Sequence, residues 1–106
     1  MDTCVFCQII SGTSPKTLVF ENDKAIVIED IHSRAPIHLL VIPKVHAVDI
    51  MALSDEQIQD VMNVVRLVIR QQNIVNFRLV HNGGGAQMID HFHMHIMGAV
   101  DKQREI

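Results

Sequence analysis

Three histidines fall within five residues of the chain, at His91, His93 and His95. Successive side chains of a β-strand point to opposite faces, so in a strand these imidazoles would share one face and the apolar residues between them would face the core. Two kinds of chemistry fit such a face. The imidazoles could bind a metal ion, or one neutral imidazole could attack phosphorus while its neighbours bind or protonate the phosphate oxygens. The spacing alone does not assign these roles.

A run of glycines at residues 83–85 precedes the histidines by only a few residues. Glycine has no side chain, so its backbone N–H groups can approach an anion closely. A plain flexible connector is the alternative interpretation. Beside three histidines, phosphate binding is at least as good an interpretation, and it favours the nucleophilic role.

Two cysteines, Cys4 and Cys7, are the only ones in the chain. In a reducing compartment, a Cys-x-x-Cys pair indicates a metal site or a redox centre before it indicates a structural disulfide. The chain starts without a basic segment, and no apolar run approaches the ~18 residues of a membrane-spanning helix. We therefore expect a cytoplasmic protein that does not associate with membranes.

The composition describes the scaffold that must hold these residues. The chain has 106 residues, of which 48% are hydrophobic and 20% are charged, so it can bury the core of a single domain spanning residues 1–106. A formal charge of −3 argues against broad electrostatic binding to nucleic acid or anionic lipid. With four Phe and no Trp or Tyr, the core must be built mainly from aliphatic side chains.

Hydrophobic patterns and turn residues predict the order of the elements. A short helix is expected at residues 6–10, a long helix begins after Ser54, and a loose tail follows from Asp101. Five strands are expected at residues 17–21, 25–29, 37–42, 77–81 and 91–97. This order predicts an α+β domain with a mostly antiparallel sheet.

The long helix has a clear N-terminal signal. Ser54 can accept a hydrogen bond from the free N–H groups of the first turn, and Gln57 completes a capping box. Apolar residues at helical spacing then predict a stripe that faces the core. Val64 and Leu67 fall off this stripe. A helix with a second apolar face usually has a second partner, so the sequence predicts a homodimer.

Several segments together resemble the histidine triad (HIT) family. Residues 91–97, His-Phe-His-Met-His-Ile-Met, are similar to its signature of three histidines that alternate with apolar residues. Residues 4–10, Cys-Val-Phe-Cys-Gln-Ile-Ile, resemble the zinc-binding start of its Hint-type members. Residues 29–31 and 35–46 resemble its central block, and Asn82, Gly83 and Gln87 match its phosphate loop. The resemblance extends over residues 4–98.

The resemblance implies a HIT-like fold and a nucleotide hydrolase or transferase. Such enzymes cleave purine nucleotide derivatives, namely phosphoramidates, adenylates or dinucleoside polyphosphates, at the α-phosphate through a covalent nucleotidyl-histidine intermediate. His93 would be the nucleophile, His95 would hydrogen-bond the phosphate, and Asp30 would hold the ribose hydroxyls. The base would lie near Ile28 and Ile31, and the phosphate side would be lined by Asn82, Ala86, Gln87 and Met88.

The resemblance also implies a zinc ion held by Cys4, Cys7, His46 and His91. Two thiolates and two imidazoles suit tetrahedral Zn²⁺, and four protein ligands leave no open position, so this zinc would be structural. A reduced, metal-free thiol pair is the alternative. The remaining histidines, His32, His38 and His81, are expected to be structural or exposed.

The sequence departs from the Hint branch next to the phosphate loop. Relatives usually carry Ser or Thr after the glutamine, where it can protonate the leaving group, whereas the thioether of Met88 has no proton to donate. The glycine loop is also shorter than in many relatives. A weakly active nucleotide-binding or scaffolding protein is therefore the alternative function. A metallohydrolase with a catalytic metal on the three histidines is a third hypothesis, which would require the strand to bend.

Overall fold

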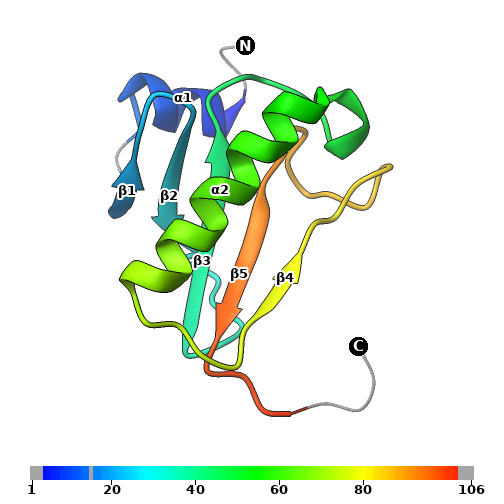
Figure 1. Ribbon diagram of the computed structural model, residues 1–106. Helices are drawn as coiled ribbons and strands as arrows, with labels where there is room; N and C mark the ends of the chain where they lie inside the picture. Colours follow the sequence, from blue (N-terminus) through cyan, green and yellow to red (C-terminus); the bar gives the residue numbers. More distant parts are fainter. Residues whose placement is uncertain (1–3, 15, 103–106) are drawn as a thin grey trace.

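The computed structural model describes residues 4–14 and 16–102, and its strands form one antiparallel sheet in the order β1-β2-β3-β5-β4. Helix α2 lies across one face of this sheet (Figure 1). The α+β class and the predicted order of elements are confirmed. In chain order the elements are α1 (Val5–Ser11), β1 (Leu18–Glu21), β2 (Ala25–Glu29), β3 (Ile37–Pro43), the 3₁₀ helix η1 (Ile50–Ala52), α2 (Asp55–Gln71), β4 (Arg78–Val80) and β5 (Met94–Gly98).

The sheet has an apolar core on each face, because side chains alternate along its strands. Val27 of β2, Val41 of β3 and Ile96 of β5 are buried with the apolar side of α2. On the other face, Ile28 and Leu40 pack with residues of α1. The sheet therefore separates the α2 core from the face that carries α1.

Helix α2 begins as predicted and buries more of its surface than predicted. The side chain of Ser54 accepts a hydrogen bond from the Gln57 N–H, and the Gln57 side chain accepts one from the Ser54 N–H, which is the expected capping box. Val64, expected outside the core-facing stripe, is only 2% exposed and belongs to the core. The prediction of a second apolar face from Val64 is therefore wrong. A helix packed on a sheet can bury a wider stripe than the i, i+3, i+4, i+7 spacing assigns to its core-facing side. Leu67 remains half-buried.

The last strand is shorter than predicted. Strand β5 begins at Met94 rather than at His91, because the chain leaves the ladder here and the N–H of Phe92 donates to the carbonyl of Ala47. The alternation of side chains nevertheless holds, since Phe92 and Ile96 are buried in the α2 core. Within the described residues, no helix has the length and apolar character needed to cross a bilayer.

Candidate functional site

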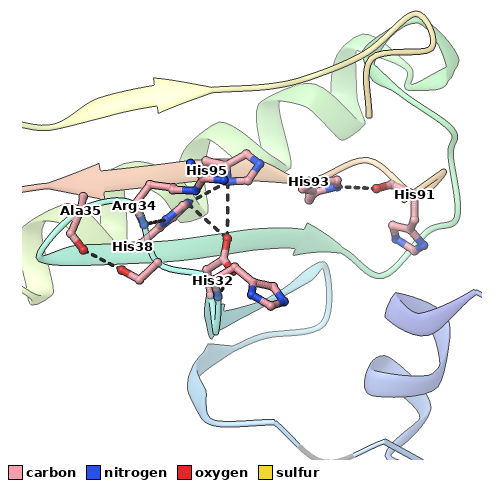
Figure 2. A network of polar contacts seen from close by, with 9 residues as sticks. His32, Arg34, Ala35, His38, His91, His93 and His95 are labelled. Atoms are coloured by element: carbon pink, nitrogen blue, oxygen red, sulfur yellow. Dashed lines mark hydrogen bonds and ion pairs between the residues drawn. The ribbon is translucent and has the colours of Figure 1, made fainter. Parts of the chain in front are cut away.

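One ring nitrogen of His93 is fixed by the backbone. Nδ1 of His93 donates a hydrogen bond to the carbonyl oxygen of His91 at 2.8 Å (Figure 2). A neutral imidazole carries one N–H, so this bond leaves the lone pair on Nε2. Burial lowers the pKa of His93, although the bond to His91 opposes this effect. At neutral pH, Nε2 of His93 is thus an unprotonated nitrogen that can act as a nucleophile.

Helix α1 holds Phe6 against this segment. The Phe6 ring meets His93 and His91 edge-on, with ring centroids 5.0 and 5.9 Å apart. Cys4 caps α1, and its Sγ accepts a hydrogen bond from the N–H of Cys7. The two cysteines therefore lie at the helix start that positions Phe6.

Four potential metal ligands converge beside α1, as the resemblance predicts. The ligand atoms of Cys4, Cys7, His46 and His91 all lie within 4.8 Å of one another. Nδ1 of His46 is 3.1 Å from Nδ1 of His91 and 3.2 Å from Sγ of Cys7, while Nδ1 of His91 is 3.5 Å from each sulfur. Zn–N bonds of about 2.0 Å and Zn–S bonds of about 2.3 Å place tetrahedral ligand atoms roughly 3.3–3.8 Å apart. The four residues fit zinc.

The protonation of His91 also suits a metal ligand. Its Nε2 donates to the carbonyl of Pro43 at 2.9 Å, which leaves the lone pair on Nδ1, the atom that faces the sulfurs. Burial lowers the pKa of His91 and keeps the ring neutral. Burial and the neighbouring Cys4 raise the pKa of Cys7. A divalent cation would remove the repulsion between two such thiolates.

A second polar cluster joins Asp30, His38 and His95. Nε2 of His38 is 2.9 Å from Nδ1 of His95 and 3.3 Å from Oδ2 of Asp30, and Nδ1 of His95 is 3.9 Å from the same oxygen. Figure 2 shows the rings of His38 and His95 facing each other from two neighbouring strands. Burial lowers the pKa of His95; the nearby rings of His93 and His38 add to this, and Asp30 opposes it.

The glycine loop, residues 82–88, is held by two side chains. The carboxylate of Asp49 accepts hydrogen bonds from the N–H groups of Gly84 and Met51, which lower its pKa. Gln87 accepts from the N–H of Gly85 and donates to the carbonyl of Val48. The backbone donors of Gly84 and Gly85, expected from the sequence to face an anion, thus bond to side chains of the chain itself.

One position of this loop requires glycine for space. A Cβ on Gly83 would lie 2.8 Å from Nε2 of His81 and 3.2 Å from Cβ of Asp49. His81 accepts a hydrogen bond from the N–H of Ile50 and packs against the ring of Phe92. His81 therefore supports the loop from the α2 side of the sheet.

The other predicted substrate residues differ in exposure. Ile28 is buried with α1, whereas Ile31 is 71% exposed and presents apolar surface next to Asp30. Met88 is 96% exposed. Asn82 and Ala86 are exposed within the glycine loop, which leads directly to His91.

Sequence reasoning missed the part played by two residues. His38, expected to be merely structural, contacts both Asp30 and His95. Its position two residues before Leu40, which pairs with His95, becomes informative only once the register of β3 and β5 is known. Asp49 was not singled out, although Asp is a favoured residue at the start of a helical turn, and here it caps η1.

The chain is similar to known proteins over most of its length. The family described as "scavenger mRNA decapping enzyme C-term binding" matches residues 3–105. The chain is 34% identical over 97 residues to an adenosine 5′-monophosphoramidase from Schizosaccharomyces pombe, covering 90% of this chain and 73% of that protein. It is 35% identical over 102 residues to an adenylylsulfatase from Arabidopsis thaliana, covering 89% and 69%.

Two further similarities concern the metal group and the fold. A 14 kDa zinc-binding protein from Brassica juncea is 34% identical over 102 residues, covering 89% of this chain and 90% of that protein. The solved structure of a HIT family hydrolase from Clostridium thermocellum superposes with a TM-score of 0.92 at 33% identity, covering 100% and 98% of the two chains.

Proposed function

Because the chain belongs to the HIT family and is a nucleotide hydrolase of its Hint-like branch, we propose that it cleaves purine nucleotide derivatives at the α-phosphate through His93. The observation that carries this proposal is the hydrogen bond from Nδ1 of His93 to the carbonyl of His91, which leaves a lone pair on Nε2. The phosphoramidase and adenylylsulfatase relatives support a leaving group joined to the α-phosphorus of an adenylate.

The proposed reaction has two displacements at phosphorus. Nε2 of His93 forms a bond to the α-phosphorus, and the bond to the leaving group breaks with its electron pair on that group. Water then attacks the phosphorus, the bond to Nε2 breaks, and the nucleotide leaves while the proton from water passes to solvent. His95 donates a hydrogen bond to a phosphate oxygen, and Asp30 accepts from the ribose hydroxyls.

Met88 bears on the leaving group in this proposal. Sulfate leaves adenylyl sulfate as a stable anion, whereas ammonia leaves a phosphoramidate only after its nitrogen gains a proton. Since Met88 has no proton to give, a phosphoramidate needs another proton donor, such as water, Asp90 or His95. We therefore place adenylyl sulfate above adenosine phosphoramidate as the better substrate of this chain.

Turnover of both substrates by the wild type and by His93→Ala tests the mechanism. His32→Ala is the matched control, because the His32 side chain is exposed. Its hydrogen bond to Asp30 comes from the backbone N–H, which the substitution keeps. We expect the His93 variant to lose at least about a thousandfold in kcat and the control to keep it. Turnover that survives in His93→Ala would exclude the mechanism. Tight nucleotide binding without turnover by the wild type would instead favour a binding or scaffolding protein, the alternative that Met88 favours.

Zinc is the proposed structural partner of Cys4, Cys7, His46 and His91. When bound, it would cross-link α1 to the segment before β5. The chemistry at phosphorus would not pass through the metal, because four protein ligands leave no open position. A Cys-x-x-Cys pair that binds zinc instead of forming a disulfide is typical of a reducing compartment, so we propose a cytoplasmic location.

We propose that the chain forms a homodimer through the edge strand β4 and not through a second apolar face of α2. Val64 is in the core, but β4 is an edge strand with the exposed Val75 and Phe77 close before it. An open edge with apolar side chains beside it favours pairing with another chain. Sedimentation of the wild type and of Phe77→Ser tests this. We expect a dimer that the substitution weakens, and a wild-type monomer at micromolar concentration would contradict it.

A further inference from the structure

The tautomer of His38 is determined by the backbone. The N–H of Arg34 donates to Nδ1 of His38 at 2.9 Å (Figure 2). A backbone N–H can only donate, so Nδ1 of His38 accepts, and the single proton of the neutral ring is on Nε2. The loop between β2 and β3, to which Arg34 belongs, therefore sets the direction in which His38 donates.

The proton on His38 in turn determines the tautomer of His95. Nε2 of His38 lies 2.9 Å from Nδ1 of His95. Two N–H groups cannot point at each other across this distance, so Nδ1 of His95 must carry the lone pair and Nε2 of His95 must carry the proton. Oδ2 of Asp30, at 3.3 Å, is a second acceptor for the same His38 proton and does not change this conclusion.

We propose that His38 is a positioning residue that fixes His95 as the Nε2–H tautomer, so that His95 presents a donor to the substrate phosphate. The inference rests on the proposed function, in which His95 contacts the phosphate. Within the described part of the chain, Nε2 of His95 makes no hydrogen bond, and the side chain is 18% exposed, so this donor is available to a ligand.

The same arrangement distinguishes this cluster from the zinc group. Asp30, His38 and His95 also bring three potential ligand atoms within 4.8 Å of one another. A metal would need the lone pair of His38 Nε2, but that nitrogen carries the proton because Nδ1 already accepts from Arg34. In His91 the bond to Pro43 leaves the lone pair on the atom that faces the cysteines. The cysteine-containing cluster is thus arranged to bind a metal. The cluster of Asp30, His38 and His95 is arranged to fix the tautomer of His95.

Nitrogen-15 NMR of the full chain labelled at histidine reads these tautomers without a substrate. We expect the proton of His95 on Nε2 in the wild type. His38→Phe keeps a ring of similar size and removes both nitrogens, so His95 should become a mixture of tautomers. His38→Gln places an amide N–H close to the position of Nε2 and should restore the wild-type tautomer.

Kinetics with adenosine phosphoramidate and adenylyl sulfate give the second readout. For His38→Phe we expect a loss of roughly tenfold in kcat with little change in KM, because His95 would still be the correct tautomer part of the time. His38→Gln should retain most of the wild-type kcat. A wild-type His95 protonated on Nδ1 would overturn the proposal, and so would a loss of kcat in His38→Phe without a change in tautomer. Failure of the wild type to turn over either substrate would reject the proposed function, while the NMR result would still decide the inference about His38.

Discussion

The carbonyl oxygen of His91 accepts the ring N–H of His93 at 2.8 Å, while the ring of the same His91 faces the sulfurs of Cys4 and Cys7. One residue therefore belongs to two groups, through its side chain to the metal ligands and through its backbone to the proposed nucleophile. This relationship makes the metal group and the orientation of His93 dependent on the same short segment.

Metal content is the first consequence to measure. The purified wild type should contain a single zinc ion per chain, because the cluster of Asp30, His38 and His95 is not arranged to bind a second one. Cys4→Ser removes one of the four ligands and should contain much less zinc. A free zinc concentration of about a hundred times the Kd would raise the free energy of unfolding by about 3 kcal/mol. Metal analysis and thermal denaturation before and after chelation check both points. Absence of zinc from the wild type and the variant alike would refute the site.

Substitution of Phe6 should lower kcat by more than its effect on the free energy of unfolding accounts for. Phe6→Leu keeps an apolar side chain in the α1 core but removes the edge contact to His93. We expect a loss of several-fold in kcat with the chain still folded. Val64→Ala on α2 is the matched control; it should cost about 2 kcal/mol of unfolding free energy and leave kcat unchanged. Equal effects of both variants on kcat would argue that Phe6 acts only through stability.

Met88→Ser should change the relation between the two substrates. A hydroxyl at this exposed position can donate a proton to the nitrogen of a departing amine, whereas sulfate does not require one. We expect kcat/KM for adenosine phosphoramidate to rise by roughly tenfold or more, and that for adenylyl sulfate to change little. A parallel change for both substrates would show that the residue acts on nucleotide binding and not on the leaving group.

Asp49 should make stability depend on pH. Hydrogen bonds from Gly84 and Met51 lower the pKa of its carboxyl in the folded chain, so folding is favoured above the unfolded value of about 4. This contribution is lost as the pH falls through the depressed folded value. The melting temperature of Asp49→Asn should therefore be below that of the wild type at neutral pH. The difference between the two melting temperatures should decrease as the solution is made acidic. Asp101→Asn, at an exposed position, is the control. A gap that does not depend on pH would contradict this assignment.

The sequence was sufficient for features that depend on local pattern. The cap at Ser54 and Gln57 requires only residues three apart, and it is present as predicted. The alternation from Phe92 to Ile96 likewise predicted which side chains enter the α2 core, even though the strand itself begins only at Met94. It did not predict that His91 and His93 are buried as well. The grouping of Cys4, Cys7, His46 and His91 came from the resemblance, because their separation along the chain carries no geometric information of its own.

The features that sequence could not supply depend on register and on competition for hydrogen bonds. The contact between His38 and His95 follows from the pairing of β3 with β5, and no local pattern encodes that register. The engagement of Gly84 by Asp49 likewise depends on two loops that meet only in the folded chain. Val64 was misplaced because the width of the buried stripe is set by the sheet beneath α2.

The division of the molecule by its sheet has a consequence for how such a chain can diverge. The larger of the two cores lies between α2 and the sheet, whereas His91, His93, His95 and α1 occupy the opposite side. Mutations that alter substrate preference can therefore accumulate in the glycine loop and near Asp30 while the platform beneath stays intact. A change in leaving-group preference therefore does not require a change in the residues packed between α2 and the sheet.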